Sequence, residues 1–139
     1  MNLAKEIFKT YDIRGIVGKT LNEDVAFAVG QVLGSMALES GNSAIAVGRD
    51  GRLSGPGLSQ ALRNGIVASG CDAIDIGCVP TPVSYYAAFA LDTACAVSVT
   101  GSHNPPDYNG LKMVIGGVTL SGDAIQSIRT RAEAGEVKT

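Results

Sequence analysis

The sequence of 139 residues contains no tryptophan, and aromatic residues make up only 5% of it. So few rings leave little surface for stacking nucleic-acid bases. The net charge of -2 also lacks the basic excess that binding to nucleic acid or anionic lipid requires. All apolar runs are shorter than the ~20 residues that span a bilayer, and residues 1–8 lack the apolar core of a secretion signal. We therefore expect a cytoplasmic protein with no nucleic-acid partner and no membrane partner.

Missing motifs exclude two further kinds of site. The three cysteines, Cys71, Cys78 and Cys95, lack the paired spacing of zinc ligands, so we predict buried free thiols rather than a metal site or a disulfide. A serine hydrolase is not supported, because the sequence contains no Gly-x-Ser-x-Gly. The single histidine, His103, directly follows Ser102, so no separate histidine remains to complete a catalytic triad.

The residues that are present predict one domain of the α/β class. Hydrophobic residues make up 45% of the chain and charged residues 17%, which is typical of a globular protein. Helical spacing of apolar residues follows four start signals, at Asn22, Ser54, Thr81 and Ser121. Strands are expected at residues 11–15, 44–47, 73–76, 94–99 and 113–115. We expect a three-layer α/β/α sandwich with a mixed, mostly parallel sheet and one antiparallel member. The domain should cover residues 1–134, and residues 135–139 should begin an interdomain linker.

A polar segment at residues 100–112 lies between two of the expected strands. If those strands pair about 5 Å apart, the chain returns and carries Lys112 towards Ser102. A hydroxyl, the imidazole of His103, the amide of Asn104 and an amine would then share a small volume. The same residues also suit a plain connecting turn, because Asn-Pro-Pro-Asp and Asn-Gly are ordinary turn formers. Residue chemistry by itself leaves both interpretations open.

Four segments, in the same order, resemble the N-terminal motifs of the alpha-D-phosphohexomutases, the phosphomannomutase/phosphoglucomutase family. They are Phe8-Lys-Thr-Tyr-Asp-Ile-Arg-Gly15, Val47-Gly-Arg-Asp-Gly-Arg-Leu-Ser54, Gly77-Cys-Val-Pro-Thr-Pro82 and Thr100-Gly-Ser-His-Asn-Pro105. The last is similar to the active-serine signature of that family. The resemblance implies the first, catalytic-serine domain of a longer enzyme that interconverts hexose 1-phosphate and hexose 6-phosphate, of mannose or glucose.

The resemblance also implies catalytic roles for Ser102, His103, Lys112 and Arg14. Ser102 would be phosphorylated and would pass its phosphate to a hexose monophosphate, giving a hexose 1,6-bisphosphate intermediate. Lys112 would be the general base, with His103 positioning the hydroxyl or sharing the proton transfer. A solvated charge at a strand end is the alternative interpretation of Lys112.

Substrate binding is expected at Tyr11, Arg14 and Asn104, since the matching tyrosine and arginine of the family line its sugar-phosphate cleft. A guanidinium suits this place because it is permanently charged and can hold two phosphate oxygens. Three charged residues of the second motif receive no role, because an ion-paired loop or a domain contact explains them as well as substrate binding does: Arg49, Asp50 and Arg52.

The family resemblance further implies Mg²⁺, held by an Asp-x-Asp-x-Asp loop together with the serine phosphate. No such triplet occurs in this sequence, so Ser102 would supply one ligand, through its phosphate, to a site that the chain leaves incomplete. We therefore expect the chain by itself to be inactive. Its expected partners are a hexose phosphate substrate, hexose 1,6-bisphosphate as activator and the remaining domains of the same enzyme. The alternative is a non-catalytic module of the same fold that binds a sugar phosphate or a partner domain.

Overall fold

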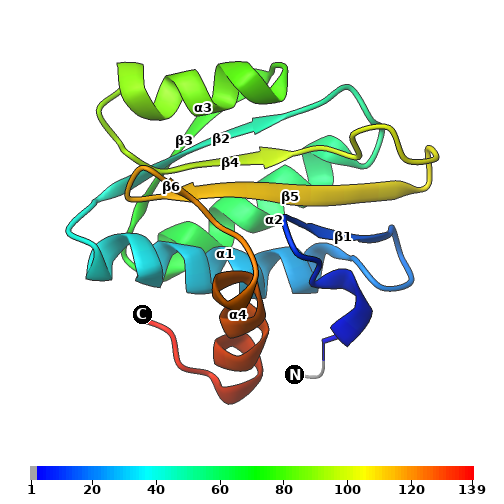
Figure 1. The fold of residues 1–139 in the computed structure, drawn as a ribbon, viewed down its shortest axis with the longest axis horizontal. Helices are drawn as coiled ribbons and strands as arrows, with labels where there is room; N and C mark the ends of the chain where they lie inside the picture. Colours follow the sequence, from blue (N-terminus) through cyan, green and yellow to red (C-terminus); the bar gives the residue numbers. More distant parts are fainter. Residues whose placement is uncertain (1–2) are drawn as a thin grey trace.

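The computed structural model describes residues 3–139, in which six strands and four α-helices form three layers (Figure 1). The strands are β1 (Ile13–Ile16), β2 (Ala44–Arg49), β3 (Asp72–Cys78), β4 (Ala96–Val99), β5 (Tyr108–Ile115) and β6 (Val118–Thr119). The helices are α1 (Glu23–Glu39), α2 (Gly55–Ala68), α3 (Thr81–Ala90) and α4 (Asp123–Ala134), preceded by the 3₁₀ turn η1 (Lys5–Ile7). The expected α/β/α sandwich is confirmed.

The sheet is mixed and has the strand order β1-β5-β4-β2-β3, with β6 paired to β5. Strand β2 runs parallel to β3 and β4, whereas β5 runs antiparallel to β1, β4 and β6. Each described strand except β5 therefore points in one direction, which confirms the expected single antiparallel member. Connection length explains the pattern, because helices join β2 to β3 and β3 to β4, whereas β4 returns directly as β5.

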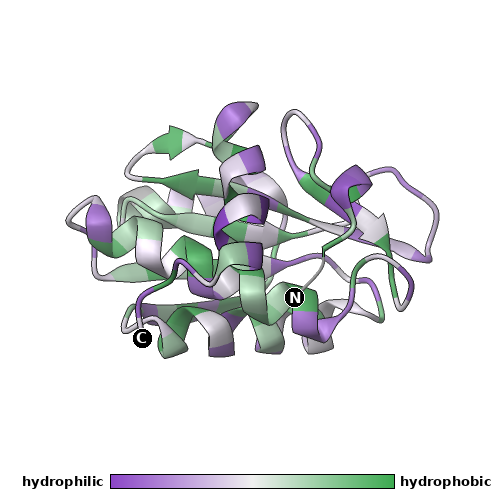
Figure 2. Cartoon of the chain, turned by 90° about the horizontal axis from the view of Figure 1, so that it is seen from below, coloured by the Kyte–Doolittle hydropathy of each residue, from purple (hydrophilic) through white to green (hydrophobic). Residues whose placement is uncertain are grey.

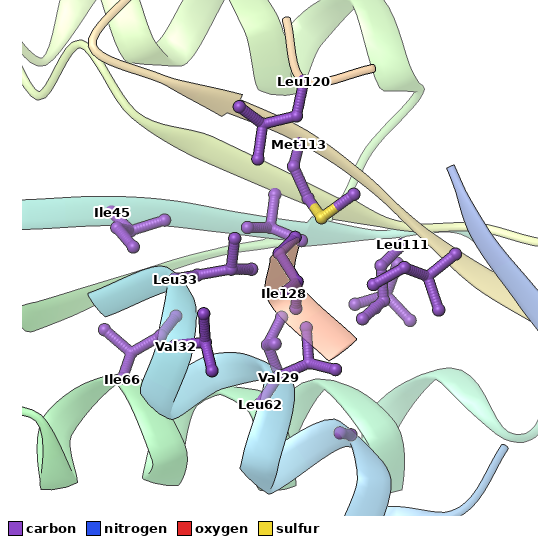
Figure 3. Packing of buried hydrophobic residues seen from close by; sticks show 14 of the residues in the cluster. Val29, Val32, Leu33, Ile45, Leu62, Ile66, Leu111, Met113, Leu120 and Ile128 are labelled. Atoms are coloured by element: carbon purple, nitrogen blue, oxygen red, sulfur yellow. The ribbon is translucent and has the colours of Figure 1, made fainter. Parts of the chain in front are cut away.

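One large hydrophobic core lies between the sheet and helices α1, α2 and α4, while α3 covers the opposite face (Figure 1). Figure 3 shows how side chains from α1, α2, α4 and the sheet interdigitate there. Residues of this core that are completely buried include Val29, Leu33, Ile45, Leu62, Ile66, Met113 and Ile128. Each large aliphatic side chain contributes about 1.5–3 kcal/mol when it is fully removed from water.

Local signals fix the ends of the helices where the sequence predicts them. The side chain of Asn22 accepts a hydrogen bond from the Val25 amide at 2.9 Å and so caps α1. Gly41, with φ of 83°, and Gly70, with φ of 95°, follow α1 and α2 in the left-handed conformation that ends a helix. Pro56 lies in the first turn of α2, where its missing N–H has no helical partner to lose.

Strand β5 is longer than the sequence predicts, since it begins at Tyr108 rather than after Lys112. Asn109 and Gly110 form a strand instead of a turn because β5 lies between β1 and β4. The Asn109 side chain is buried there and donates to Ser54 Oγ at 2.8 Å. A side chain at Gly110 would collide with the backbone of β1. In the same way, Gly48 and Arg49 belong to β2 and not to the loop expected after it.

All three cysteines are free, and Cys71 and Cys95 are buried as predicted. The prediction is wrong for Cys78, which is exposed at the end of β3, the strand at one edge of the sheet. Burial raises the pKa of the Cys71 thiol to about 11 and also raises that of Cys95. Both thiols therefore stay protonated at neutral pH.

Small residues let α1 and α2 pack closely. A Cβ at Gly65 of α2 would collide with the Phe27 carbonyl of α1. Gly→Ala in a helix usually stabilises by about 1 kcal/mol. We expect Gly65→Ala instead to destabilise by roughly 1–3 kcal/mol, because backbone on the facing helix cannot move aside easily. Urea unfolding measures this, with Gly57→Ala as the control.

The control lies in the same helix, and its added Cβ would meet only the carboxylate end of the Glu23 side chain, with the nearest atom at 3.0 Å. We expect Gly57→Ala to be neutral or stabilising. A gain of stability in Gly65→Ala would contradict the close approach of the two helices.

The C-terminal residues continue along the body of the domain after α4. The Lys138 amide donates to Ser35 Oγ at 2.8 Å, and Val137 packs against the core. The division into 1–134 and 135–139 stays a prediction, and residues 1 and 2 lie outside the described part. Figure 2 shows that the helices on this side carry both hydrophobic and hydrophilic stretches. Within residues 3–139, no helix is long and apolar enough to cross a membrane.

Candidate functional site

The serine loop, residues 100–107, connects β4 to β5 at the carboxyl end of β4 (Figure 1). The Thr100 amide donates to the Gly110 carbonyl at 2.9 Å and closes the base of the loop. Because β2 and β4 are parallel, residues 50–54, which follow β2, lie at the same end of the strands. Ligands of open α/β sheets bind at the carboxyl ends of the strands.

Ser102 is exposed, and its backbone adopts the left-handed conformation with φ of 53°. Residues other than glycine rarely adopt this conformation unless the surroundings hold them in it. Here the Ser102 amide donates to Thr100 Oγ1 at 3.0 Å. His103 is exposed beside it, and the Asn104 side-chain amide donates to the Gly101 carbonyl at 2.9 Å. The serine hydroxyl is therefore carried on a backbone fixed by its neighbours.

Sequence reasoning gave no role to Asp50 and Arg52, yet both contact the serine loop. Their side chains pair at 3.3 Å between Arg52 Nε and Asp50 Oδ2. Asp50 accepts hydrogen bonds from Thr100 and Gly101, and the Arg52 guanidinium donates to several loop carbonyls. Their spacing could have identified them, because Asp50 and Arg52 are alternate polar residues after β2 and both side chains reach the serine loop.

A second group of site residues surrounds an open cavity of about 720 Å³. It is lined by Phe8, Lys9, Thr10, Tyr11, Asp12, Arg14, Lys112, Gly122, Asp123 and Gln126. Three cations and two carboxylates face this cavity, and Arg14 Nε lies 3.9 Å from Asp12 Oδ2. Lys9, Asp12 and Asp123 line the cavity but were not among the predicted site residues, although Lys9 and Asp12 lie within the first motif. An excess of positive charge of this kind suits a phosphorylated ligand.

Strand register explains why Arg14 and Lys112 share this cavity. Ile13 pairs with Leu111, and both side chains are completely buried on the helix α1 side of the sheet. Alternate residues point to opposite faces, so Arg14 and Lys112 lie on the other face, on neighbouring strands. The cavity thus brings together three predicted site residues, including Tyr11, which is 73% exposed.

The remaining predicted residues lie at a different place. Ser102 and Asn104 line a separate hollow with Asp50 and Arg52. The backbone of Lys112 lies opposite Ser98 rather than Ser102. The approach of the lysine ammonium to the serine hydroxyl stays a prediction.

Comparison with known proteins identifies the family and the fold. Residues 5–138 match the family described as phosphoglucomutase/phosphomannomutase, alpha/beta/alpha domain I. The chain belongs to this family. The matched residues include both the serine loop and the cavity lined by Lys9, Arg14 and Lys112, which we call the cationic cavity.

Relatives of known name agree with this assignment. The phosphomannomutase/phosphoglucomutase of Pseudomonas aeruginosa is 51% identical over 135 residues, covering 97% of this chain and 29% of that protein. The phosphoglucomutase of Neisseria meningitidis serogroup A is 52% identical over 127 residues, covering 91% and 28%. A crystal structure of a family protein from Burkholderia thailandensis superposes with a TM-score of 0.95 at 48% identity, covering 99% of this chain and 32% of that one. The chain thus spans about 29% of the length of the curated relatives that it matches.

The described part of domain I shows no cluster of metal-binding side chains. Among residues 3–139, no three His, Cys, Asp or Glu residues cluster in a way that could hold a metal ion. The described residues therefore do not fit bound Mg²⁺ without ligands from elsewhere. What the site can do with its own groups is hold an anion, present a hydroxyl and move a proton.

Proposed function

We propose that this domain I carries the phosphate-accepting serine of a phosphohexomutase. Ser102 takes a phosphoryl group and exchanges it with hexose 1-phosphate and hexose 6-phosphate, of mannose or glucose, through a hexose 1,6-bisphosphate. The observation that supports this most directly is the exposed Ser102 on a loop with a fixed, left-handed backbone. A hydroxyl held in this way is presented to a ligand without further ordering.

The cationic cavity supplies the second part of the proposal. Phosphoryl transfer needs cations around the negative charge of the phosphate, and Lys9, Arg14 and Lys112 face one space. We assign Arg14 and Tyr11 to the phosphate and sugar of the substrate. Asn104 takes part through its side-chain carbonyl, since its N–H is bonded to Gly101.

The proposed step transfers the phosphoryl group from Ser102 to a sugar hydroxyl. A sugar hydroxyl attacks the phosphorus of phosphoserine, the bond between phosphorus and serine Oγ breaks, and a bond from phosphorus to the sugar oxygen forms. Lys112 accepts the proton of the attacking hydroxyl, with His103 positioning that hydroxyl. Lys112 then donates that proton to serine Oγ as this oxygen leaves, so no proton is gained or lost overall. After the bisphosphate turns over, the reverse step returns its other phosphate to Ser102.

We further propose that the substrate cleft is completed by other domains of a longer enzyme, since the named relatives are about three times as long. Mg²⁺ would be held by those domains, with the phosphate on Ser102 as the only ligand from this chain. Hexose 1,6-bisphosphate would serve as activator. The cytoplasm is the proposed location, because the reducing conditions there suit three free cysteines.

The proposal is tested with a chimera in which residues 5–138 of this chain replace the matching segment of the Pseudomonas aeruginosa relative. We expect the chimera, with Mg²⁺ and hexose 1,6-bisphosphate, to convert hexose 1-phosphate to hexose 6-phosphate. The chain alone should unfold cooperatively but show no turnover, because its residues 3–139 form no metal site and, by this proposal, other domains complete the cleft.

Phosphopeptide mapping of the chimera should place the phosphate on Ser102. A folded chimera that binds hexose phosphate without turnover would favour a binding module instead. Steady turnover by the purified chain alone, above that of a mock preparation from the same host, would overturn the need for other domains.

A further inference from the structure

The guanidinium of Arg52 donates to four backbone carbonyls, three in the serine loop and one in Tyr108, the first residue of β5. The acceptors are Ser102 (3.1 Å), Asn104 (2.8 Å), Pro105 (2.6 Å) and Tyr108 (3.2 Å). Its side chain is only 17% exposed, so these are bonds of a largely buried charge. Charge-assisted hydrogen bonds of this kind are roughly twice as strong as neutral ones.

Asp50 holds the start of the same loop, and Ser54 contacts strand β5 just beyond its end. Asp50 Oδ2 accepts from the Gly101 amide at 2.9 Å and from Thr100 Oγ1 at 3.1 Å. At the far end, Ser54 Oγ accepts from the Asn109 side chain at 2.8 Å. Alternate residues of one short segment, Asp50, Arg52 and Ser54, therefore contact the start of the loop, its middle and strand β5 just beyond it.

Gly101 shows how closely Arg52 fits the loop. A Cβ at this position would collide with the guanidinium, so only glycine leaves room for the arginine. The next residue is Ser102, whose left-handed backbone has its carbonyl held by Arg52 and its amide by Thr100. The arginine thus acts on the backbone that aims the serine hydroxyl.

We propose that Arg52, oriented by Asp50, is a positioning residue that fixes the backbone of the serine loop and thereby the direction of the Ser102 hydroxyl. The consequence for phosphoryl transfer rests on the proposed function, whereas the consequence for loop order does not. Lysine cannot replace this arginine, because its ammonium lacks the planar fork of donors that reaches several carbonyls at once. The exposed Ser102 and His103 side chains stay available to a ligand, since the Arg52 guanidinium donates to the backbone carbonyls of the loop.

The first experiment measures amide hydrogen exchange by NMR in the chain of residues 1–139, comparing Arg52→Met and Arg52→Lys with wild type. The reporters are the amides of Gly101, Ser102, Asn104 and Tyr108, which are all hydrogen-bonded within the loop or to Asp50. We expect their exchange to be at least about tenfold faster in both variants, with α1 changed less than about twofold. The control is Arg63→Met, which removes a partly exposed arginine paired with Asp75 outside the loop.

A second pair of variants tests the fit without changing the arginine. Gly101→Ala displaces the guanidinium, whereas Gly51→Ala adds a Cβ that meets nothing within 4 Å. We expect faster loop exchange in Gly101→Ala and wild-type exchange in Gly51→Ala. Unchanged loop exchange in both Arg52→Met and Gly101→Ala would overturn the proposal. Equal acceleration of loop and core amides would also overturn it, because that would mark general destabilisation.

The third measurement links loop order to chemistry in the chimera. We expect Arg52→Met and Arg52→Lys to slow phosphorylation of Ser102 by about 10²-fold with KM changed less than about threefold, as misplacing a reacting group does. Slow phosphorylation with an unchanged loop would overturn positioning in favour of direct contact with substrate. If the wild-type chimera takes up no phosphate, the proposed function fails, while the exchange data still decide whether Arg52 orders the loop.

Discussion

Replacing Ser102 with alanine in the chimera is expected to reduce hexose phosphate conversion by about 10⁴-fold or more, because the phosphate acceptor is lost. Substrate affinity should change little, since the cations of the cavity remain in place. The measurement is a coupled assay of hexose 6-phosphate formation, together with mass spectrometry of the peptide that contains residue 102.

Two control variants separate the hydroxyl from the backbone. Ser102 has a positive φ, so alanine at this position strains the loop, whereas glycine adopts the conformation freely. Ser102→Gly should therefore be as inactive as Ser102→Ala, and Ser43→Ala, at an exposed serine, should behave as wild type. Activity in the glycine variant would show that the hydroxyl is not the acceptor.

Replacing Lys112 with methionine is expected to lower kcat by roughly 10²- to 10⁴-fold, the usual contribution of a positioned acid or base. The side chain is half-buried in the cationic cavity beside Arg14, which keeps a phosphate-binding charge when the lysine is removed. KM should therefore rise much less than kcat falls. Steady-state kinetics of the chimera at saturating bisphosphate give both values.

Lys112→Arg decides between a base and a fixed charge. Arginine retains its proton at every working pH, so it can replace a charge but cannot accept a proton. We expect this variant to be nearly as slow as Lys112→Met, and Lys19→Met, at an exposed turn, to match wild type. Near-normal turnover in Lys112→Arg would reduce Lys112 to an electrostatic role.

The sequence by itself determined the elements that depend on local signals. The cap at Asn22 and the glycines at 41 and 70 define helix ends through contacts within a few residues, so their positions could be read directly. The alternation of strands and helices predicted the three layers. The short, direct connection through the serine loop predicted the one antiparallel strand, because only a crossover helix allows a parallel return. Four motifs in the family's order indicate the family from the sequence alone.

Tertiary structure decided what depends on distant partners. Asn109 and Gly110 are turn formers, yet β1 and Ser54 hold them in strand β5, which no local propensity could indicate. The register of β1 against β5 placed Arg14 and Lys112 on one face, and a shift of β1 by one residue would have moved Arg14 to the opposite face, toward the core. Asp50 and Arg52 contact the serine loop only because parallel pairing places the carboxyl ends of β2 and β4 side by side. Their bonds join residues about fifty positions apart, so the loop that carries Ser102 owes its shape to a segment that the sequence alone left without a function.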